Sequence, residues 1–399
     1  MNNKFICTTS LLYVLSATVV SAQTLNDVVA DQLASDGSAC AKLLGGGSAS
    51  QLTGELQTLC TRTVPSGGPP PSNAGGGGAA TPSSLPKIVK QRLRNDKTDE
   101  LGSGASSDQV LNITPAISLF LSGEYQSLDR NVTTFEDGYD SDIWRIIAGS
   151  DYRIQDILII GVAFDYQHQK GDYTGSGDFK LDSYGGLIFA NITPTDNLYI
   201  QISGGYSALE NDRHRLTSFT EASTSTSVSG FVDSQYDSDQ YSANIQSGYD
   251  FNIANITIGP RVGFSWSRNN FDSYTESGNT GLELSFDEDH RTSLQSRFGL
   301  FSSTAFSTRF GVVVPQFGAD WVHEFEDDQR EIQFSFVNDL RSKSLAFQNE
   351  SPDRDFFEIH AGTSIVMAHN FQAYVNYRAI TGHSYFDGHS VNFGLRIGF

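Results

Sequence analysis

From Leu111 to Phe399 the chain is built of long segments in which apolar and polar residues alternate. In one of them, Tyr241, Ala243 and Ile245 alternate with serine, asparagine and glutamine. The last nine residues, VNFGLRIGF, alternate in the same way and end on an aromatic residue. Because successive side chains of a β-strand point to opposite faces, each segment predicts a strand with one apolar and one polar face.

Twelve such strands are predicted, over residues 112–127, 141–154, 156–169, 178–192, 196–209, 237–252, 254–268, 289–307, 310–325, 355–368, 370–382 and 387–399. The connections near residues 155, 194, 253, 308 and 369 are short. The others are long (128–140, 170–177, 210–236, 269–288 and 326–354), apart from a tight one near residue 385. Strands of about a dozen residues can cross a bilayer at a tilt, and this asymmetry of turns is typical of outer-membrane barrels.

The fold class predicted is therefore all-β, a transmembrane antiparallel barrel of twelve strands in the outer membrane. An open sheet edge in hydrocarbon would leave backbone groups without hydrogen bonds, so the last strand is expected to close on the first. Both ends of the barrel would then lie on the periplasmic side.

Residues 1–22 read as a signal peptide. Lys4 precedes an apolar stretch to Val20, and small residues suit cleavage before Gln23. An uncleaved N-terminal anchor is the alternative, but the stretch is short for a spanning helix. We expect export through the Sec translocon and then residence in the outer-membrane lipid bilayer.

Three zones precede the barrel. Residues 23–64 contain two short helix candidates and the pair Cys40 and Cys60, for which a disulfide is the default in an exported chain. Residues 65–84 form a Pro/Gly/Ser linker. Residues 85–96, LPKIVKQRLRND, form a predicted helix with Lys87, Lys90, Arg92 and Arg94, the only basic stretch of an acidic chain. An ordinary solvated surface helix is the alternative.

Residues 111–399 resemble the autotransporter β-domain, the translocator unit of type V secretion. The blocks ISLFLSGEY, GYDSDIWRIIAGSDYRIQDILIIGVAFDY, VPQFGADWVHEF, PDRDFFEIHAGTS and GLRIGF carry the likeness. The resemblance implies a passenger, a linker helix in the pore and a twelve-stranded barrel, with residues 85–96 in the position of that helix. It also implies that Phe399 is an assembly signal for the barrel-assembly machinery. The chain departs from the family in its passenger, because only residues 23–84 precede the helix.

A basic helix in a confined lumen needs acidic or acceptor partners. Strand parity predicts lumen-facing carboxylates at Glu124, Asp151, Asp165, Asp320 and Glu358. The same parity turns arginines 145, 153, 261, 297, 378 and 396 inward, so the predicted lumen is mixed in charge.

The sequence does not indicate an enzyme. It has no G-x-S-x-G or H-E-x-x-H motif, and the zone before the barrel has no histidine. The acidic runs 286–290 and 324–328 read as solvated loops rather than Ca²⁺ sites. Asn95 and Asp96 suit either passenger cleavage or a plain helix end. No cofactor, metal or catalytic residue is expected, and the net charge of -20 argues against a nucleic-acid partner.

The function expected is translocation or display of residues 23–84 at the cell surface. The alternative is an adhesin that contacts a host or cell-surface ligand through loops 210–236 and 326–354. A barrel protease is a third class, which would need an outer-rim site around His290 or His323.

Overall fold

The computed structural model describes Pro65–Ser66 and residues 117–399, except 134, 156, 221–226, 281, 338–343 and 369. The predicted signal peptide, the pair Cys40 and Cys60, the basic segment 85–96 and Asn95–Asp96 lie outside the described residues. The expectations about them therefore remain predictions. Among the described residues, no helix is long and apolar enough to cross a membrane.

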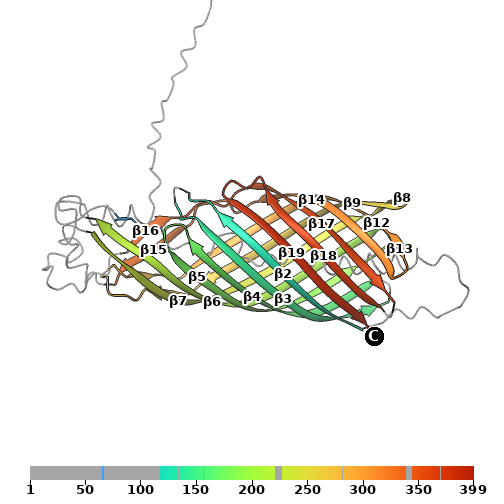
Figure 1. The fold of residues 1–399 in the computed structure, drawn as a ribbon, viewed down its shortest axis with the longest axis horizontal. Coiled ribbons are helices and arrows are strands. Elements are labelled where there is room, and N and C mark those ends of the chain that lie inside the picture. Colours follow the sequence, from blue (N-terminus) through green and yellow to red (C-terminus); the bar gives the residue numbers. More distant parts are fainter. Residues whose placement is uncertain are drawn as a thin grey trace, which may run out of the picture.

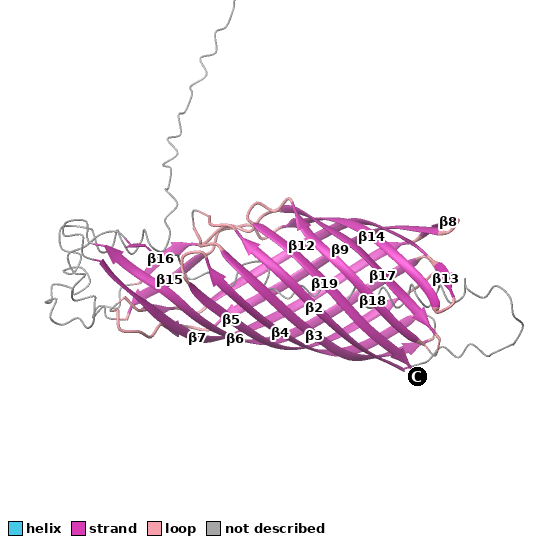
Figure 2. Ribbon diagram, viewed as in Figure 1, coloured by secondary structure: helices cyan, strands magenta, loops and turns pink. Residues whose placement is uncertain are grey.

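Twelve antiparallel strands form a closed barrel, as predicted (Figures 1 and 2). Each pairs with its neighbour in the chain, and the last pairs with the first. The strands are β2 (Ile117–Arg130), β3 (Tyr139–Ile154), β4 (Leu158–Tyr173), β5 (Gly177–Ile192), β6 (Leu198–Thr220), β7 (Ser227–Tyr249), β9 (Ile256–Phe271), β12 (Asp289–Thr304), β14 (Gly311–Glu324), β17 (Asp355–Met367), β18 (Phe371–Thr381) and β19 (Phe386–Gly398).

Closure is made by β19 against β2. The paired residues run from Phe386 opposite Arg130 to Gly398 opposite Ser118. The Phe399 amide then donates to the Ile117 carbonyl at 2.9 Å. The alternating C-terminal segment is thus the closing strand of the barrel, and no edge of the sheet is left in the membrane.

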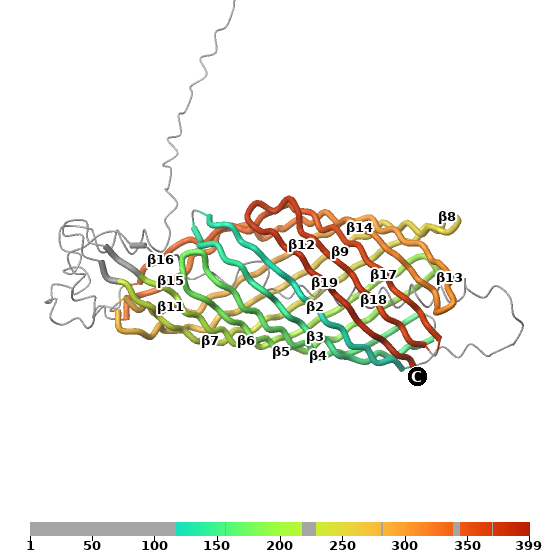
Figure 3. The backbone as a smooth tube through the Cα atoms, viewed as in Figure 1, coloured from blue at the N-terminus to red at the C-terminus, as the bar shows by residue number. Residues whose placement is uncertain are grey.

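Short strands extend the barrel at both ends. At the end that holds the C-terminus, β8 (Phe251–Ile253) pairs with β9, and β13 (Phe306–Thr308) pairs with β14. At the opposite end a separate sheet contains β10 (Tyr274–Thr275), β11 (Leu284–Phe286), β15 (Glu331–Phe336) and β16 (Leu345–Gln348) (Figure 3). The two-residue strand β1 (Pro65–Ser66) pairs with the tip of β6.

The two ends of the barrel differ in their connections. The turns beside the C-terminus are tight, and Gln155, Ala254 and Asn370 adopt left-handed φ values of 55°, 52° and 55° in them. Left-handed residues are usual in short hairpin turns, whose twist matches that of the strands. The opposite end carries the longer connections. By the usual asymmetry of outer-membrane barrels, the C-terminal end faces the periplasm.

Four of the predicted long loops contain strand, and one of them, segment 326–354, contains β15 and β16. Segment 210–236 is mostly strand, because β6 continues to Thr220 and β7 begins at Ser227. Segment 170–177 shrinks to a turn, because β4 continues to Tyr173 and β5 begins at Gly177. Segment 269–288 contains the end of β9 as well as β10 and β11. The strands keep their inward alternation above the membrane, where their outer faces become polar, so the apolar pattern fades before the strand ends.

The outer face of the barrel is apolar at mid-height. Ile146, Val162 and Ile188 are 53%, 56% and 67% exposed. Such exposure of apolar side chains is unfavourable in water but suits contact with lipid. Aromatic pairs lie on this face at Tyr125–Trp144, Tyr166–Tyr184, Tyr206–Tyr241 and Phe298–Trp321, with ring centroids 4.7 to 5.8 Å apart. Such pairs form the aromatic girdle expected at a membrane interface.

We predict that Phe399→Ala lowers the amount of heat-modifiable, folded barrel in the outer membrane severalfold. The substitution removes the terminal aromatic side chain but keeps the backbone bond to Ile117. The measurement is the folded fraction in membrane preparations by unheated gel electrophoresis. Phe310→Ala is the matched control, since Phe310 is an exposed aromatic at the same end of the barrel. Equal folded fractions for the two variants would contradict an assembly role for Phe399.

Candidate functional site

The lumen wall is the first candidate site. All five predicted carboxylates face the interior, and each is at most 8% exposed; they are Glu124, Asp151, Asp165, Asp320 and Glu358. The predicted inward arginines other than Arg153 bind these carboxylates directly, as the pairs below show. Arg153 lies on the same face near the periplasmic turn and is half-buried.

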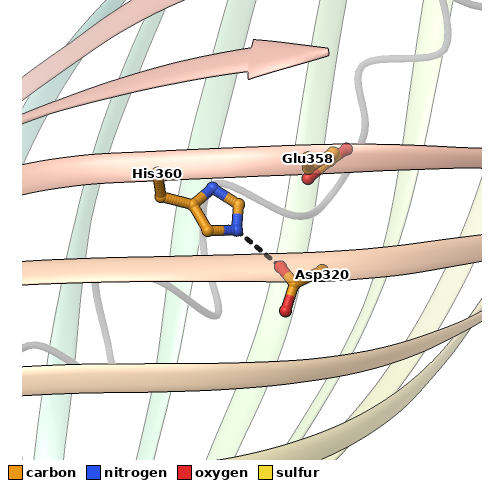
Figure 4. A group of neighbouring side chains, drawn as sticks. All are labelled: Asp320, Glu358 and His360. Carbon is orange, nitrogen blue, oxygen red and sulfur yellow. Dashed lines mark hydrogen bonds and ion pairs between the residues drawn. The ribbon is translucent and has the colours of Figure 1, made fainter. Parts of the chain in front are cut away.

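Asp320 on β14 is the centre of one group. Arg261 on β9 donates from Nε and Nη2 to its two carboxylate oxygens, both at 2.5 Å. His360 on β17 approaches the same carboxylate through Nε2 at 2.5 Å, as Figure 4 shows. A bidentate arginine is the strongest common partner of a carboxylate, so Asp320 is held in place from both sides.

Glu358 on β17 is the centre of a second group. Arg297 on β12 lies 2.7 Å from one of its oxygens, and Arg378 on β18 lies 3.5 Å from the other. Arg378 also reaches Glu124 on β2 at 3.3 Å. These ion pairs therefore form one continuous network on one side of the barrel. Its residues come from four strands, β12, β17, β18 and β2.

Two further pairs complete this wall. Arg145 on β3 binds Asp165 on β4 at 2.5 Å. Arg396 on β19 lies 3.8 Å from Asp151 and donates to the Ser118 hydroxyl at 2.6 Å. Each predicted carboxylate is thus neutralised by an arginine of the wall itself. This pairing removes the electrostatic reason for expecting the carboxylates to hold the basic segment 85–96.

Asp320, Glu358 and His360 also resemble a metal-ligand set, since their ligand atoms lie within 4.8 Å of one another. Their chemistry argues against that use. Arg261 occupies both oxygens of Asp320, while Arg297 and Arg378 occupy those of Glu358. A cation would have to displace arginines from buried pairs, so the group serves as an ion-pair network.

The outer mouth is the second candidate site, and sequence reasoning missed it. Strands β10, β11, β15 and β16 form a four-stranded sheet, here called the cap, from two segments far apart in the chain. Leu284 pairs with Phe336, and Phe286 pairs with Phe334. The cap has its own apolar core, in which no side chain is more than 9% exposed: Leu282, Leu284, Phe286, Ile332, Phe334, Phe336 and Phe347.

The cap is fixed to the barrel by polar contacts. Arg215 on β6 makes three hydrogen bonds of 2.8 to 3.1 Å to Glu276, and both side chains are buried. Asp233 on β7 and Ser277 exchange two backbone hydrogen bonds. Tyr274 stacks between Tyr236 of β7 and Phe286 of the cap, with centroids 4.3 and 4.7 Å apart. The cap is therefore anchored to the β6–β7 side of the mouth.

The other side of the mouth is lined by an apolar cluster of Leu128, Tyr139, Tyr173, Phe179 and Phe386. His383, in the connection between β18 and β19, packs against Phe386 and lies 3.7 Å from Asp353. Burial lowers the pKa of His383 to about 4 despite this carboxylate, so the imidazole is neutral at neutral pH. This side of the mouth thus combines packed aromatic side chains with a buried ion pair, Arg130–Glu136 at 2.5 Å, whose guanidinium lies over the Tyr385 and Phe386 rings.

The structure corrects the prediction for the acidic run 324–328 at Glu324 only, since Glu326 and Asp328 are exposed. Glu324 is 2% exposed rather than solvated, and it accepts hydrogen bonds from the Ser293 hydroxyl at 2.6 Å and the Leu294 amide at 2.8 Å. Asp289, the first residue of β12, pairs with Arg330, just before the cap strand β15, at 3.2 Å. Glu324 thus joins β14 to β12, and Asp289 joins β12 to the base of the cap.

Of the two histidines considered for a rim protease, His323 lies on the outer surface. It pairs with Asp355 at 2.9 Å, and that carboxylate also accepts from the Trp321 indole at 2.9 Å. His290 lies on β12 and is exposed. His323 therefore lies among the aromatic girdle residues on the outer surface. This position does not support a protease site at the rim.

A family model, the autotransporter β-domain, matches residues 119–378, well over half of the chain. The chain belongs to the autotransporter β-domain family. This membership, with the closed barrel, makes it an outer-membrane protein of the translocator type. The resemblance predicted from the sequence is confirmed.

Solved structures show the same fold. The translocator domain of the autotransporter NalP from Neisseria meningitidis aligns with a TM-score of 0.57 at 12% identity, covering 80% of this chain and 98% of that one. The β-domain of the Bordetella autotransporter BrkA aligns with a TM-score of 0.53 at 14% identity, covering 71% and 100%.

Curated relatives are longer than this chain. Outer membrane protein A of Rickettsia conorii is 22% identical over 71% of this chain and 14% of its own length. Esterase EstA of Pseudomonas aeruginosa is 24% identical over 62% of this chain and 38% of its own length. The chain thus spans well under half of the length of the curated relatives it matches.

We predict that Asp320→Asn destabilises the barrel by about 3–5 kcal/mol, because it leaves Arg261 and His360 against a neutral amide in a buried site. The measurement is urea unfolding of protein refolded in lipid vesicles. Asp142→Asn is the control, since it removes the charge of an exposed acceptor of the Tyr125 hydroxyl but keeps an acceptor oxygen, and it is expected to cost about 1 kcal/mol or less. Equal shifts for both variants would show that the network is not a stabilising unit.

We also predict that Glu276→Ala opens the mouth. A Ser141→Cys thiol serves as the probe, because Ser141 is an inward residue of β3 that is 5% exposed. On intact cells an impermeant maleimide is expected to label the Ser141→Cys thiol at least tenfold more slowly than an Asp287→Cys thiol on the exposed side of the cap. Glu276→Ala is expected to abolish most of this difference in labelling rate. Arg354→Ala, which removes an exposed ion pair with Asp327, is the control. Fast labelling of Ser141→Cys with the native Glu276 would mean that the cap does not close the mouth.

Proposed function

We propose that this protein translocates its own N-terminal segment, residues 23–84, through the barrel and displays it at the cell surface. Membership of the autotransporter β-domain family carries the proposal. The place of the first strand supports it. β2 starts at Ile117 on the periplasmic side, so the residues that precede it reach the barrel at its periplasmic mouth.

The lumen suits such a passage. Its charged residues are paired within the wall, so a passing chain meets few uncompensated charges. The cap limits when a polypeptide can pass the outer mouth, because the core of the cap is packed and its Glu276 is bonded to Arg215 of β6. A chain can pass the outer mouth only before the cap packs or while it is displaced, which favours one transit followed by closure.

Adhesion through surface loops is the weaker alternative for this chain. It was expected to use flexible segments 210–236 and 326–354. The first is mostly a regular hairpin, and the described part of the second contributes Ile332, Phe334 and Phe347 to the buried core of the cap. The name of the esterase relative describes that longer protein, and no hydrolytic role is proposed for this one.

An epitope tag inserted at Gly67 tests the proposal. Display predicts antibody labelling of intact cells at a level close to that of permeabilised cells. A tag in the exposed turn 174–176 marks the outer side, and a tag at Thr195 in a short periplasmic turn marks the inner side. Labelling of the Gly67 tag only after permeabilisation, like the Thr195 tag, would exclude display of residues 23–84.

A further inference from the structure

The β6–β7 hairpin rises far above the membrane. Its two strands are 23 residues long each, whereas the other barrel strands have 16 residues or fewer. Ser218 lies twelve residues beyond Tyr206, a girdle residue of the same strand. At the usual rise of a strand this is about 40 Å along β6. The tip of the hairpin therefore lies well outside the lipid bilayer.

The two edges of this hairpin are covered differently. The edge of β7 is covered by the cap, because Asp233 and Ser277 exchange two backbone hydrogen bonds. The neighbour of β6 on the other side is β5, which begins at Gly177 opposite Arg215. Residues 216–220 of β6 thus extend beyond β5, and we call them the β6 edge. A strand edge presents backbone N–H and C=O groups to which another extended chain can bond.

The β6 edge is held in a fixed position. Directly beneath it, the Arg215 guanidinium lies 2.8 Å from the Glu276 carboxylate of the cap, and both side chains are buried. His214 stacks on Phe231 of β7 with ring centroids 4.3 Å apart. A rigid edge loses little conformational entropy when a strand binds to it, so it is suited to docking.

A strand from the N-terminal part of the chain lies on this edge. In the part of the chain that the structure describes, β1 is the one strand that pairs with it. The pairing is antiparallel, with Pro65 opposite Phe219 and Ser66 opposite Ser218. β1 therefore lies at the outer end of the barrel, whereas Ile117, where β2 begins, lies at the periplasmic end (Figure 1).

The sequence around β1 fits an added strand of this length. Continued in the same register, residues 64–68, VPSGG, would lie opposite residues 220–216. The three prolines 69–71 would follow at the level of Arg215, where β5 takes over the edge. Proline has no N–H, so three in succession end a ladder, whereas Pro65 is tolerated in an edge strand when its nitrogen faces solvent.

We propose that the β6 edge is a strand-docking site at the cell surface and that the linker segment around Pro65–Ser66 is its occupant. The proposal rests on the proposed function, because the linker reaches the outer end of β6 only by crossing the membrane. Binding is by backbone hydrogen bonds, as in other cases of β-strand addition. The docked strand fixes residues 23–64, which precede it, to the rim of the barrel.

Disulfide trapping on intact cells tests the docking in the full-length protein. With Cys40→Ser and Cys60→Ser as background, Ser66→Cys is combined with Ser218→Cys, the residue opposite it on β6. Ser66→Cys with Ser229→Cys is the matched control, since Ser229 lies opposite Ser218 on β7, one strand farther from β1. Adjacent strands are about 5 Å apart and next-but-one strands about 10 Å, which is beyond the reach of a disulfide.

An impermeant oxidant forms the bonds, and electrophoresis of the heated, unreduced protein separates bonded from open chains. Unheated samples confirm that each variant folds. Docking predicts that the bond from Ser66→Cys to Ser218→Cys forms at least fivefold more completely than the bond to Ser229→Cys. Equal yields, or no bond to Ser218→Cys, would overturn it. Bonds between two copies of the chain through Ser218→Cys would also overturn it, because the edge would then pair with a second copy.

An impermeant maleimide separates failure of the docking from failure of the proposed function. A Ser66→Cys thiol that is labelled on intact cells but forms no bond with Ser218→Cys would refute the docking and keep display. A Ser66→Cys thiol that is labelled only after permeabilisation would refute both.

Discussion

The backbone hydrogen bonds of β19 to β2 are the interaction on which the rest of the structure depends. Within hydrocarbon no water replaces a missing partner, so a sheet of twelve strands is tolerated only when its first and last strands meet. The pairs from Phe386–Arg130 to Gly398–Ser118 satisfy both edges at once. Closure also separates a lumen from the lipid, and only a closed wall can keep buried arginine and carboxylate pairs away from lipid.

The lumen is then divided by what its strands contribute. The predicted charged residues form their ion pairs on one arc, from β9 through β19 to β4. Strands β6 and β7 contribute Gln201, Ser203, Gln240 and Asn244, with Arg215 bonded to Glu276 nearer the outer mouth. In the ionic arc each charge is compensated by a neighbour on an adjacent or nearby strand, such as Asp320 by Arg261 and His360. That arc stiffens the wall. The cap lies at the outer end of the barrel, above both arcs.

The alternation of apolar and polar residues predicted the barrel, its strand number and the inward direction of residues such as Glu124 and Asp320. It could do so because the two-residue period of a strand is visible in neighbouring residues of the sequence. It did not predict how far β6 and β7 rise above the membrane, since their outer faces turn polar there. Nor did it predict the cap, in which Leu284 meets Phe336 across some fifty residues of chain. Ion-pair partners such as Arg297 and Glu358 depend on register across several strands, which no local pattern contains.

The central claim is that the barrel carries residues 23–84 to the cell surface. Protease treatment of intact cells tests it most directly. The account predicts that added protease removes an epitope tag at Gly67 while a tag at Thr195 stays intact. Loss of the Gly67 tag only after permeabilisation would contradict it.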